Sequence, residues 1–143
     1  MSRVQLALNV SDLDAAVAFY SKVFATPPAK LRPGYANFAI SEPPLKLILI
    51  EGGGEPGSVN HLGVEVEGAE QVKQAGDRLV ADGLEVAAED QVTCCYAVQD
   101  KVWVTDPDGA PWEIYTVLAD SEADASLCCV GDTPDSAQAP AAL

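Results

Sequence analysis

Basic residues and long apolar runs are scarce in this sequence of 143 residues. Eight Lys and Arg stand against 22 Asp and Glu, which gives a formal net charge of −14 at pH 7. Such a chain lacks the positive surface that binds nucleic acid, and an anionic membrane surface would repel it. No apolar run reaches the roughly 18 residues of a membrane span, and the N-terminal segment has no apolar core typical of a secretion signal. We therefore expect a cytoplasmic protein whose partners include neither nucleic acid nor membrane.

Histidine is also scarce, whereas cysteine occurs in an unusual arrangement. Because His61 is the only histidine, any histidine-ligated metal or histidine-assisted catalysis must use it. The four cysteines form two adjacent pairs, Cys94-Cys95 and Cys128-Cys129. In a reducing compartment, we expect thiols or ligands for soft metals rather than structural disulfides.

The composition changes once, near residue 118. Beyond it the chain is rich in Ala, Asp, Ser and Pro and has few large apolar residues. We predict a folded domain over 1–118 and a loosely held acidic tail over 119–143, since such a composition buries little apolar surface.

The predicted domain contains an internal repeat with an offset of 56 residues. Residues 4–16 (VQLALNVSDLDAA) align with 60–72 (NHLGVEVEGAEQV), and their apolar positions coincide. Strict alternation predicts a strand with one buried face at the start of each segment, and helical spacing follows in both. We expect Ser11 to cap the first helix and Gly83 to end the second.

Further strand-like segments complete each half of the repeat. ANFAIS and KLILIE close the first half, and KVWVTD and WEIYTV close the second. Here the offset is 64, so the second half is eight residues longer, and the extra length falls within 84–99. Each half therefore has the pattern βαβββ. Two such modules, about 1–54 and 58–118, can curl around a shared cavity as an α+β fold.

Three polar side chains of the two modules can converge in that cavity. Gln5 and His61 occupy equivalent positions opposite the helix-packed face, and Glu113 can face the same cavity from the last strand. An amide, an imidazole and a carboxylate form a three-ligand set that leaves metal coordination positions open. Alternatively, Gln5 and His61 only form hydrogen bonds within a polar cavity. Leu49, which aligns with Glu113, cannot bind a metal.

The sequence resembles the vicinal oxygen chelate superfamily, which includes glyoxalase I, the extradiol dioxygenases and the bleomycin-resistance proteins. The resemblance rests on NVSDLDAAVAFYSKVF, NHLGVEV and DPDGAPWEIY, and it extends over nearly all of 1–118. It implies metal ligands at Gln5, His61 and Glu113. With Leu49 at the fourth position, a three-ligand Fe(II) site is favoured over a four-ligand glyoxalase site. Extradiol-type members carry His where this chain has Gln5, and an amide is the weaker ligand.

The segment TCCYA (93–97) resembles the organoarsenical C–As bond lyases, a branch often described as cadmium-induced proteins. This resemblance implies that Cys94 and Cys95 bind the substrate. Trivalent arsenic is thiophilic, and two adjacent thiolates can chelate it. Because neighbours in a strand face opposite ways, a shared ligand requires a loop or a bulge at this point. The alternative is that the two cysteines are small buried residues of a strand.

The combined resemblance implies a non-haem Fe(II) enzyme that uses O₂ to cleave trivalent methyl or aromatic arsenicals to arsenite. Gln5, His61 and Glu113 would act through the iron, and Cys128 and Cys129 would have an accessory role. One alternative is a resistance protein that binds arsenite or Cd²⁺ without turnover. Another is a small extradiol or glyoxalase-like enzyme, which gives no reason for adjacent cysteines. A homodimer is compatible with each of these functions.

Overall fold

The computed structural model describes residues 2–94 and 96–120. Cys95, Cys128 and Cys129 lie outside the described residues, as does almost all of the predicted tail. The helices and strands follow one another as β1 (Arg3–Val10), α1 (Leu13–Val23), β2 (Lys30–Arg32), β3 (Tyr35–Ile40), β4 (Leu45–Glu51), β5 (Val59–Glu65), α2 (Ala69–Ala81), β6 (Ala87–Cys94), β7 (Ala97–Thr105) and β8 (Pro111–Asp120).

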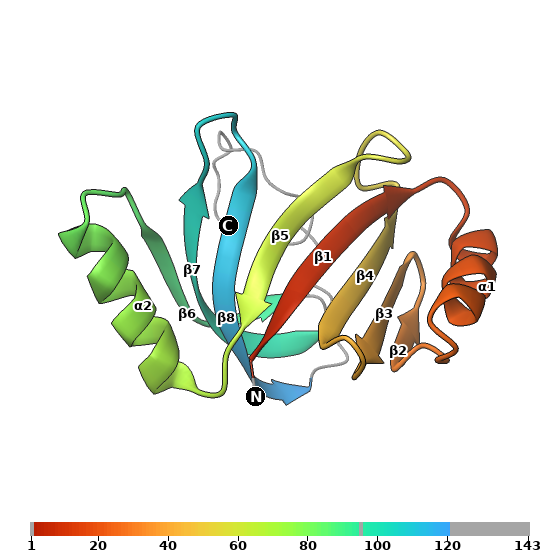
Figure 1. Cartoon of the computed structure of the whole chain (residues 1–143), viewed down its shortest axis with the longest axis horizontal. Coiled ribbons are helices and arrows are strands. Elements are labelled where there is room, and N and C mark those ends of the chain that lie inside the picture. Colours follow the sequence, from red (N-terminus) through yellow and green to blue (C-terminus); the bar gives the residue numbers. More distant parts are fainter. Residues whose placement is uncertain (1, 95, 121–143) are drawn as a thin grey trace.

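All eight strands belong to one curled sheet of order β2-β3-β4-β1-β5-β8-β7-β6 (Figure 1). Each half has the predicted order βαβββ, with α1 packed on β3 and β4 and α2 packed on β7 and β8. The predicted α+β fold with two related modules is therefore confirmed. No helix in the described part of the chain is long and apolar enough to cross a membrane.

The two modules meet at the centre of the sheet, where β1 and β5 pair in antiparallel fashion. Leu6 and Leu62, which the repeat aligns, are direct partners in this ladder. Such pairing is expected where a pseudo-two-fold axis passes between equivalent strands. The axis places Gln5 and His61 on opposite sides of the Leu6–Leu62 pair, because Gln5 pairs with Gly63 and Ala7 pairs with His61.

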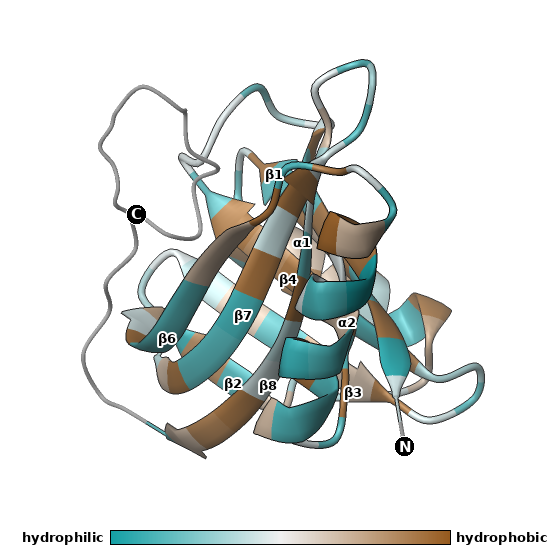
Figure 2. Cartoon of the chain, turned by 90° about the vertical axis from the view of Figure 1, so that its left-hand side faces the viewer, coloured by the Kyte–Doolittle hydropathy of each residue, from teal (hydrophilic) through white to brown (hydrophobic). Residues whose placement is uncertain are grey.

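The two faces of the sheet differ in chemistry. The face on which the helices pack, here called the outer face, carries an apolar core that includes Leu13, Phe38, Leu47 and Leu49. The opposite, inner face carries most of the buried polar side chains. On β7, three consecutive polar residues, Gln99 to Lys101, form a continuous hydrophilic stretch of the strand (Figure 2). Since neither α1 nor α2 covers the inner face, burial there among the described residues results from the curl of the sheet.

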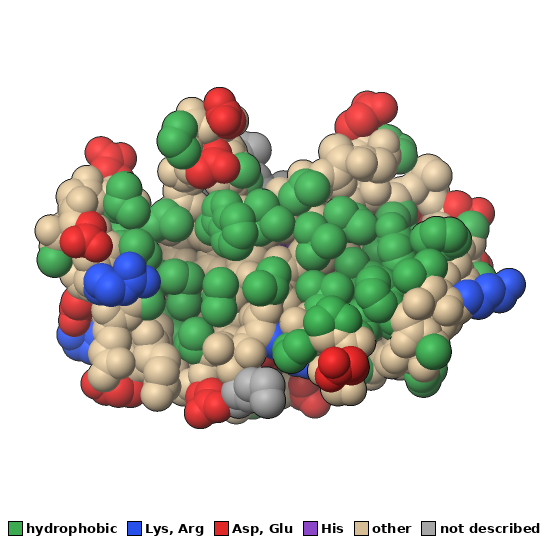
Figure 3. Space-filling view, in the orientation of Figure 1, with side chains coloured by type: hydrophobic (Ala, Val, Ile, Leu, Met, Phe, Trp, Pro, Cys, Tyr) green, Lys and Arg blue, Asp and Glu red, His purple; other side chains and the backbone are tan. Residues whose placement is uncertain are grey.

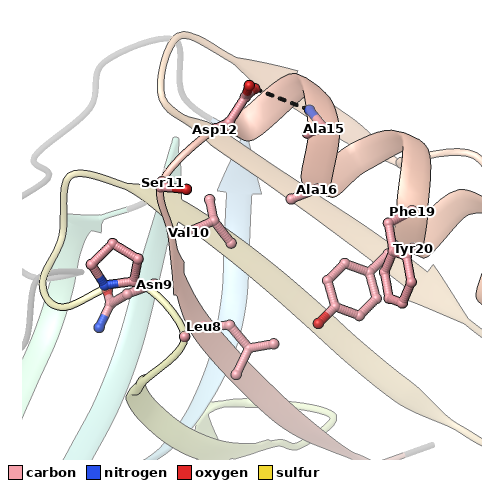
Figure 4. A pocket seen from close by; sticks show the side chains of 11 residues that line it. Leu8, Asn9, Val10, Ser11, Asp12, Ala15, Ala16, Phe19 and Tyr20 are labelled. Carbon is pink, nitrogen blue, oxygen red and sulfur yellow. Dashed lines mark hydrogen bonds between the residues drawn. The ribbon is translucent and has the colours of Figure 1, made fainter.

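Two local predictions fare differently. The predicted cap at Ser11 is wrong: Asp12, with extended backbone, is the N-cap, and its carboxylate accepts a hydrogen bond from the Ala15 N–H at 3.1 Å (Figure 4). Asp12 is positioned for this role because the helix begins one residue later, at Leu13. The end of α2 agrees with the prediction, since Gly83 follows the C-cap with a φ of 91°.

The last strand is slightly longer than the sequence pattern indicates. Strand β8 continues to Asp120, two residues beyond the predicted domain end at 118. Ala119 and Asp120 still pair with the first residues of β7. The alternating pattern ends earlier than the strand because these last residues are exposed.

Candidate functional site

The three predicted metal ligands meet on the inner face of the central strands. Gln5 on β1, His61 on β5 and Glu113 on β8 are all buried, with exposed fractions of 1%, 2% and 3%. Gln5 Nε2 donates a hydrogen bond to Glu113 Oε2 at 2.5 Å, and His61 Nε2 lies 3.2 Å from the same oxygen. The donor groups of three adjacent strands therefore converge on one point.

A β-bulge orients the imidazole of His61. The register of β1 and β5 shifts after the Ala7–His61 pair, so that Leu8 pairs with Val59 and Asn60 is the extra residue. The bulge lets the side chains of Asn60 and His61 meet, with Asn60 Oδ1 2.7 Å from His61 Nδ1. Bulges near functional sites commonly redirect side chains in this way.

The hydrogen bonds of Asn60 define which imidazole nitrogen carries the proton. Asn60 Nδ2 donates to Asn9 Oδ1 at 2.9 Å, and Asn9 Nδ2 donates to Ser58 Oγ at 2.9 Å. The remaining Asn60 oxygen must therefore accept a hydrogen bond from His61 Nδ1–H. In the neutral ring, this leaves the Nε2 lone pair directed at Gln5 and Glu113, as a metal ligand requires.

Gly63 provides the space in which these groups converge. A Cβ atom at this position would lie 2.7 Å from the Glu113 carbonyl oxygen, 2.9 Å from Glu113 Cγ and 3.0 Å from Gln5 Nε2. Only glycine leaves that volume free. The donors and the space fit a divalent cation, because the amide of Gln5 can turn its oxygen inward and Glu113 supplies a negative charge.

The sequence reasoning missed Lys101, which lies beside the third predicted ligand. Its ammonium is 2.8 Å from Glu113 Oε1, and its side chain is 1% exposed. Burial would raise the pKa of Glu113, but Lys101 and His61 outweigh burial and hold that pKa well below its ordinary value. Glu113 is therefore a carboxylate with one oxygen held by Lys101 and the other directed at Gln5 and His61. Alternation along KVWVTD could have identified Lys101, since Trp103 on the same face lies 5.5 Å from the His61 ring.

The residue at the fourth ligand position is Ile48, whereas the repeat alignment predicted Leu49. Gly63 pairs with Glu113 across β5 and β8, and its repeat equivalent Ala7 pairs with Ile48 across β1 and β4. Leu49 points to the outer face and packs in the core under α1. The alignment failed because the turn between β7 and β8 spans five residues, whereas the turn between β3 and β4 spans four. Ile48 cannot bind a metal either, so the three-ligand set is unchanged.

Cys94 lies at the tip of the hairpin formed by β6 and β7. Strand β6 ends at Cys94, β7 begins at Ala97, and these two residues pair. Cys94 thus lies beside a tight turn, and the chain does not continue as a straight strand there. Tyr96 has a φ of 64°, in the left-handed region that such turns require.

The extra length of the second module lies in this hairpin. Strands β6 and β7 have 8 and 9 residues, against 3 and 6 in β2 and β3. The longer hairpin reaches the first module, where Lys30 Nζ donates to the Tyr96 carbonyl at 2.8 Å and the Tyr35 and Tyr96 rings lie 5.5 Å apart. Cys94 is 1% exposed there, in a cluster that includes Ala7 and Ile48 of the inner face. The candidate thiol and the candidate metal ligands therefore share one face of the sheet.

The donor set is unusual in composition. Within residues 2–94 and 96–120, no group of three or more His, Cys, Asp and Glu side chains is placed to hold a metal. The candidate set instead combines one imidazole and one carboxylate with the amide of Gln5.

Comparison with known proteins agrees with this fold. The sequence model of the Glyoxalase/Bleomycin resistance protein/Dioxygenase superfamily matches residues 3–114, and the chain belongs to this superfamily. It is 60% identical, over 100% of its own length and 97% of the relative's, to a trivalent organoarsenical cleaving enzyme of Thermomonospora curvata. It is 55% identical to the cadmium-induced protein CadI of Mycobacterium bovis, over 92% of this chain and 95% of that one.

Solved structures support the fold alone. An extradiol ring-cleaving dioxygenase from B. fuscum superimposes with a TM-score of 0.62 at 20% identity, over 84% of this chain and 34% of that one. The predicted resemblance to the vicinal oxygen chelate superfamily and to its organoarsenical branch is thus confirmed.

Proposed function

We propose that this protein is an Fe(II)- and O₂-dependent C–As bond lyase that converts trivalent methyl or aromatic arsenicals to arsenite. The similarity to a trivalent organoarsenical cleaving enzyme supports the substrate class. The observation that carries the proposal is the placement of Cys94 and of the Gln5, His61 and Glu113 set on one enclosed face. A binding protein that only sequesters arsenic would not need the set of Gln5, His61 and Glu113.

Gln5, His61 and Glu113 would hold the metal. Gln5 contributes its amide oxygen, His61 contributes Nε2, and Glu113 contributes Oε2, since Lys101 already occupies Oε1. Fe(II), when bound, would supply the activation of O₂ that oxidative cleavage of a carbon bond requires. Three protein ligands leave room for further ligands at such a centre.

The surrounding residues hold the ligand side chains in one orientation. Asn60 fixes His61 through Nδ1, and Lys101 fixes Glu113 through Oε1. Trp103 and Tyr115 line the same face, and burial with the charge of Glu113 raises the pKa of Tyr115, so its phenol stays neutral. His61, Lys101, Glu113 and Tyr115 are buried, which keeps water away from this part of the face.

Cys94 and Cys95 would bind arsenic as a chelate. Two adjacent thiolates replace two oxygen ligands of a trivalent organoarsenical and leave its bond to carbon intact. The turn between Cys94 and Ala97 supports this proposal, because adjacent side chains of a straight strand face opposite ways. The arsenic-bound carbon is then held on the face that carries Gln5, His61 and Glu113. Cys128 and Cys129 would have an accessory role.

We also propose that the protein works in the cytoplasm as a homodimer joined through the outer face. Between the two helices this face is broadly apolar (Figure 3), with Val4 49% exposed and Leu6, Leu62, Val64 and Ile114 half-buried. None of these five side chains is charged, so contact through this patch places no like charges directly opposite one another. Sedimentation of the full chain should show a dimer, and Val64→Glu should yield monomers; a monomeric wild type would contradict the interface.

Separate titrations of Fe(II) and methylarsenite test the assignment of the two sites. Cys94→Ser should lower arsenic affinity by orders of magnitude, because the second tethered thiol acts at high effective concentration, and should leave Fe(II) affinity unchanged. His61→Ala should lower Fe(II) affinity and leave arsenic affinity unchanged. Neither variant should cleave the substrate at the wild-type rate. A Cys94→Ser, Cys95→Ser double variant with wild-type turnover would contradict the proposal. Arsenic binding without turnover in the iron-loaded wild type would favour the sequestering protein.

A further inference from the structure

The basic residues of this acidic chain are unevenly distributed. The three that lie on helices, Lys22, Lys73 and Arg78, are exposed. The other five of the eight lie on strands and share the inner face, as their pairing with Glu65, Asn37, Tyr35, Gln5 and Tyr115 shows; they are Arg3, Lys30, Arg32, Lys46 and Lys101. Positive charge is thus concentrated where the candidate site lies.

Lys46 differs from Arg3, Lys30 and Lys101 on the same face, because no carboxylate forms an ion pair with it among the described residues. Arg3 pairs with Glu65 at 2.7 Å, and Lys30 pairs with Asp120 at 3.3 Å. Lys46 forms no hydrogen bond or salt bridge with any residue that the structure describes, and its ammonium lies only over a ring, 5.2 Å from the centroid of Tyr115. Glu65 and Glu113 act on this charge only through longer-range attraction, without an ion pair.

Lys46 lines a pocket of about 280 Å³ on the inner face. Three cations and two carboxylates line this pocket, and both carboxylates, Glu65 and Asp120, are the partners of Arg3 and Lys30. The pocket therefore has one positive charge in excess, at Lys46. Burial lowers the pKa of Lys46, and a bound anion would offset that shift.

Gln99 adds a second unsatisfied group to the same pocket. Its Nε2 donates to the Cys94 carbonyl at 2.9 Å, whereas its buried Oε1 has no hydrogen-bond partner among the described residues. Buried polar atoms in folded proteins are nearly always paired, so this acceptor indicates a donor on a ligand or on a water that accompanies it. The pocket thus suits an anionic oxygen accompanied by a hydrogen-bond donor, which a water beside it can supply.

The pocket lies between the two sites already described. Lys46 is the direct partner of Gln5 in the β1–β4 ladder, and Gln99 contacts the backbone of Cys94. A ligand whose arsenic is held by the cysteines and whose reacting carbon is near Gln5 could therefore place a further substituent in this pocket.

We propose that this pocket is a subsite for an acidic substituent, a carboxylate, on the organic group of the arsenical, with Lys46 as its counter-ion. The proposal rests on the proposed lyase function and narrows its substrate class to aromatic arsenicals with an acidic group. Charge-assisted hydrogen bonds to a carboxylate are among the stronger polar contacts in proteins, so the preference should be measurable.

The test compares trivalent phenylarsenite with its 4-carboxyphenyl analogue on the iron-loaded enzyme. Wild type should have the lower KM for the carboxylated compound. Lys46→Met, which keeps the length of the side chain, should reduce the ratio of the two kcat/KM values by about tenfold or more, the size expected for one lost charge-assisted contact. Lys46→Arg should retain much of the preference. Lys73→Met, the same change in the exposed Lys73–Asp77 pair, should leave the ratio unchanged. Equal preference in wild type and Lys46→Met would overturn the subsite.

Calorimetry with benzoate separates this subsite from the lyase function. Metal-free wild type should bind benzoate, and Lys46→Met should not. If wild type cleaves neither arsenical but binds benzoate through Lys46, the subsite stands and the lyase function fails. If inorganic phosphate binds through Lys46 as tightly as benzoate while the carboxylated arsenical has no advantage, the pocket serves a free anion, and the assignment to a substrate substituent is wrong.

Discussion

The two halves of the sheet have the same order of elements but carry different groups on their inner faces. In the first half, β3 and β4 are almost wholly buried, and Ile48 occupies the position that Glu113 holds in the second half. In the second half, β7 and β8 carry Lys101 and Glu113, and the longer β6–β7 hairpin carries Cys94.

The two copies of the module therefore have different roles in the protein. The first half supplies the larger apolar core and a single polar ligand, Gln5. The second half supplies the carboxylate, the imidazole and the thiol, at the cost of a less apolar interior. Substitutions that exchange or remove these features should therefore affect stability in one half and chemistry in the other.

The largest effect should follow from Glu113→Gln, which removes the anionic ligand of the second half. Turnover and Fe(II) affinity should fall by more than about 100-fold, since even groups that only orient a ligand are worth 10–100-fold. Unfolding of the metal-free protein should also require less free energy, by about 3 kcal/mol, because Lys101 is left buried without its partner. In a Glu113→Gln, Lys101→Met double variant, stability should return and turnover should not. Recovery of both would contradict the role of Glu113 as a ligand.

A carboxylate at the equivalent position of the first half should erase the difference between the modules. Ile48→Glu should destabilise the metal-free protein by about 3 kcal/mol, since a buried carboxyl without a partner is costly. Added metal should restore the melting temperature, while turnover falls because a fourth protein ligand fills an open position. Ile48→Met is the matched control and should cost less than about 1.5 kcal/mol. A metal-insensitive Ile48→Glu protein would show that the two positions are not equivalent.

Asn60→Ala should weaken the site without removing a ligand. His61 would lose the acceptor that holds Nδ1–H, so Fe(II) affinity should fall about 10–100-fold. Titration calorimetry measures this loss, and Ser58→Ala, two hydrogen bonds away along the same chain of residues, should have a smaller effect. An unchanged affinity in Asn60→Ala would show that the bulge is only structural.

The smallest effect on chemistry should come from the core of the first half. Phe38 is fully buried under α1, and Phe38→Leu should lower the free energy of unfolding by about 1–2 kcal/mol. Its kcat/KM should remain at the wild-type value in urea-free buffer. A large loss of activity with this small loss of stability would contradict the division of tasks.

Alternation and repeat spacing were sufficient to predict the two modules and the shared face of Gln5, His61 and Glu113. A period of two residues identifies the face of a strand, and an internal repeat identifies which strands are equivalent. The spacing could not reveal register. Two features change which side chains meet without changing the sequence pattern: the bulge at Asn60 and the one-residue difference between the two turns. For this reason the fourth ligand position was assigned to Leu49 instead of Ile48.

Contacts between side chains of different strands also could not be predicted from the sequence. Tyr96 contacts Tyr35 only because the sheet curls and the long hairpin reaches the first module. Lys101 contacts Glu113 across the neighbouring strands β7 and β8, whose register the spacing does not give. The prediction of Ser11 as the helix N-cap was wrong for a simpler reason. Both residues can cap, and the first residue of the helix decides between them.

The most direct test of this account is the speciation of arsenic after anaerobic reconstitution. Protein loaded with Fe(II) and methylarsenite without oxygen should release no arsenite, and admission of air should release it. Zn²⁺-loaded protein and the Cys94→Ser, Cys95→Ser double variant should release none under the same conditions. Release of equal amounts without oxygen, or with Zn²⁺ alone, would contradict the claim that an iron site and a thiol site on one face act together.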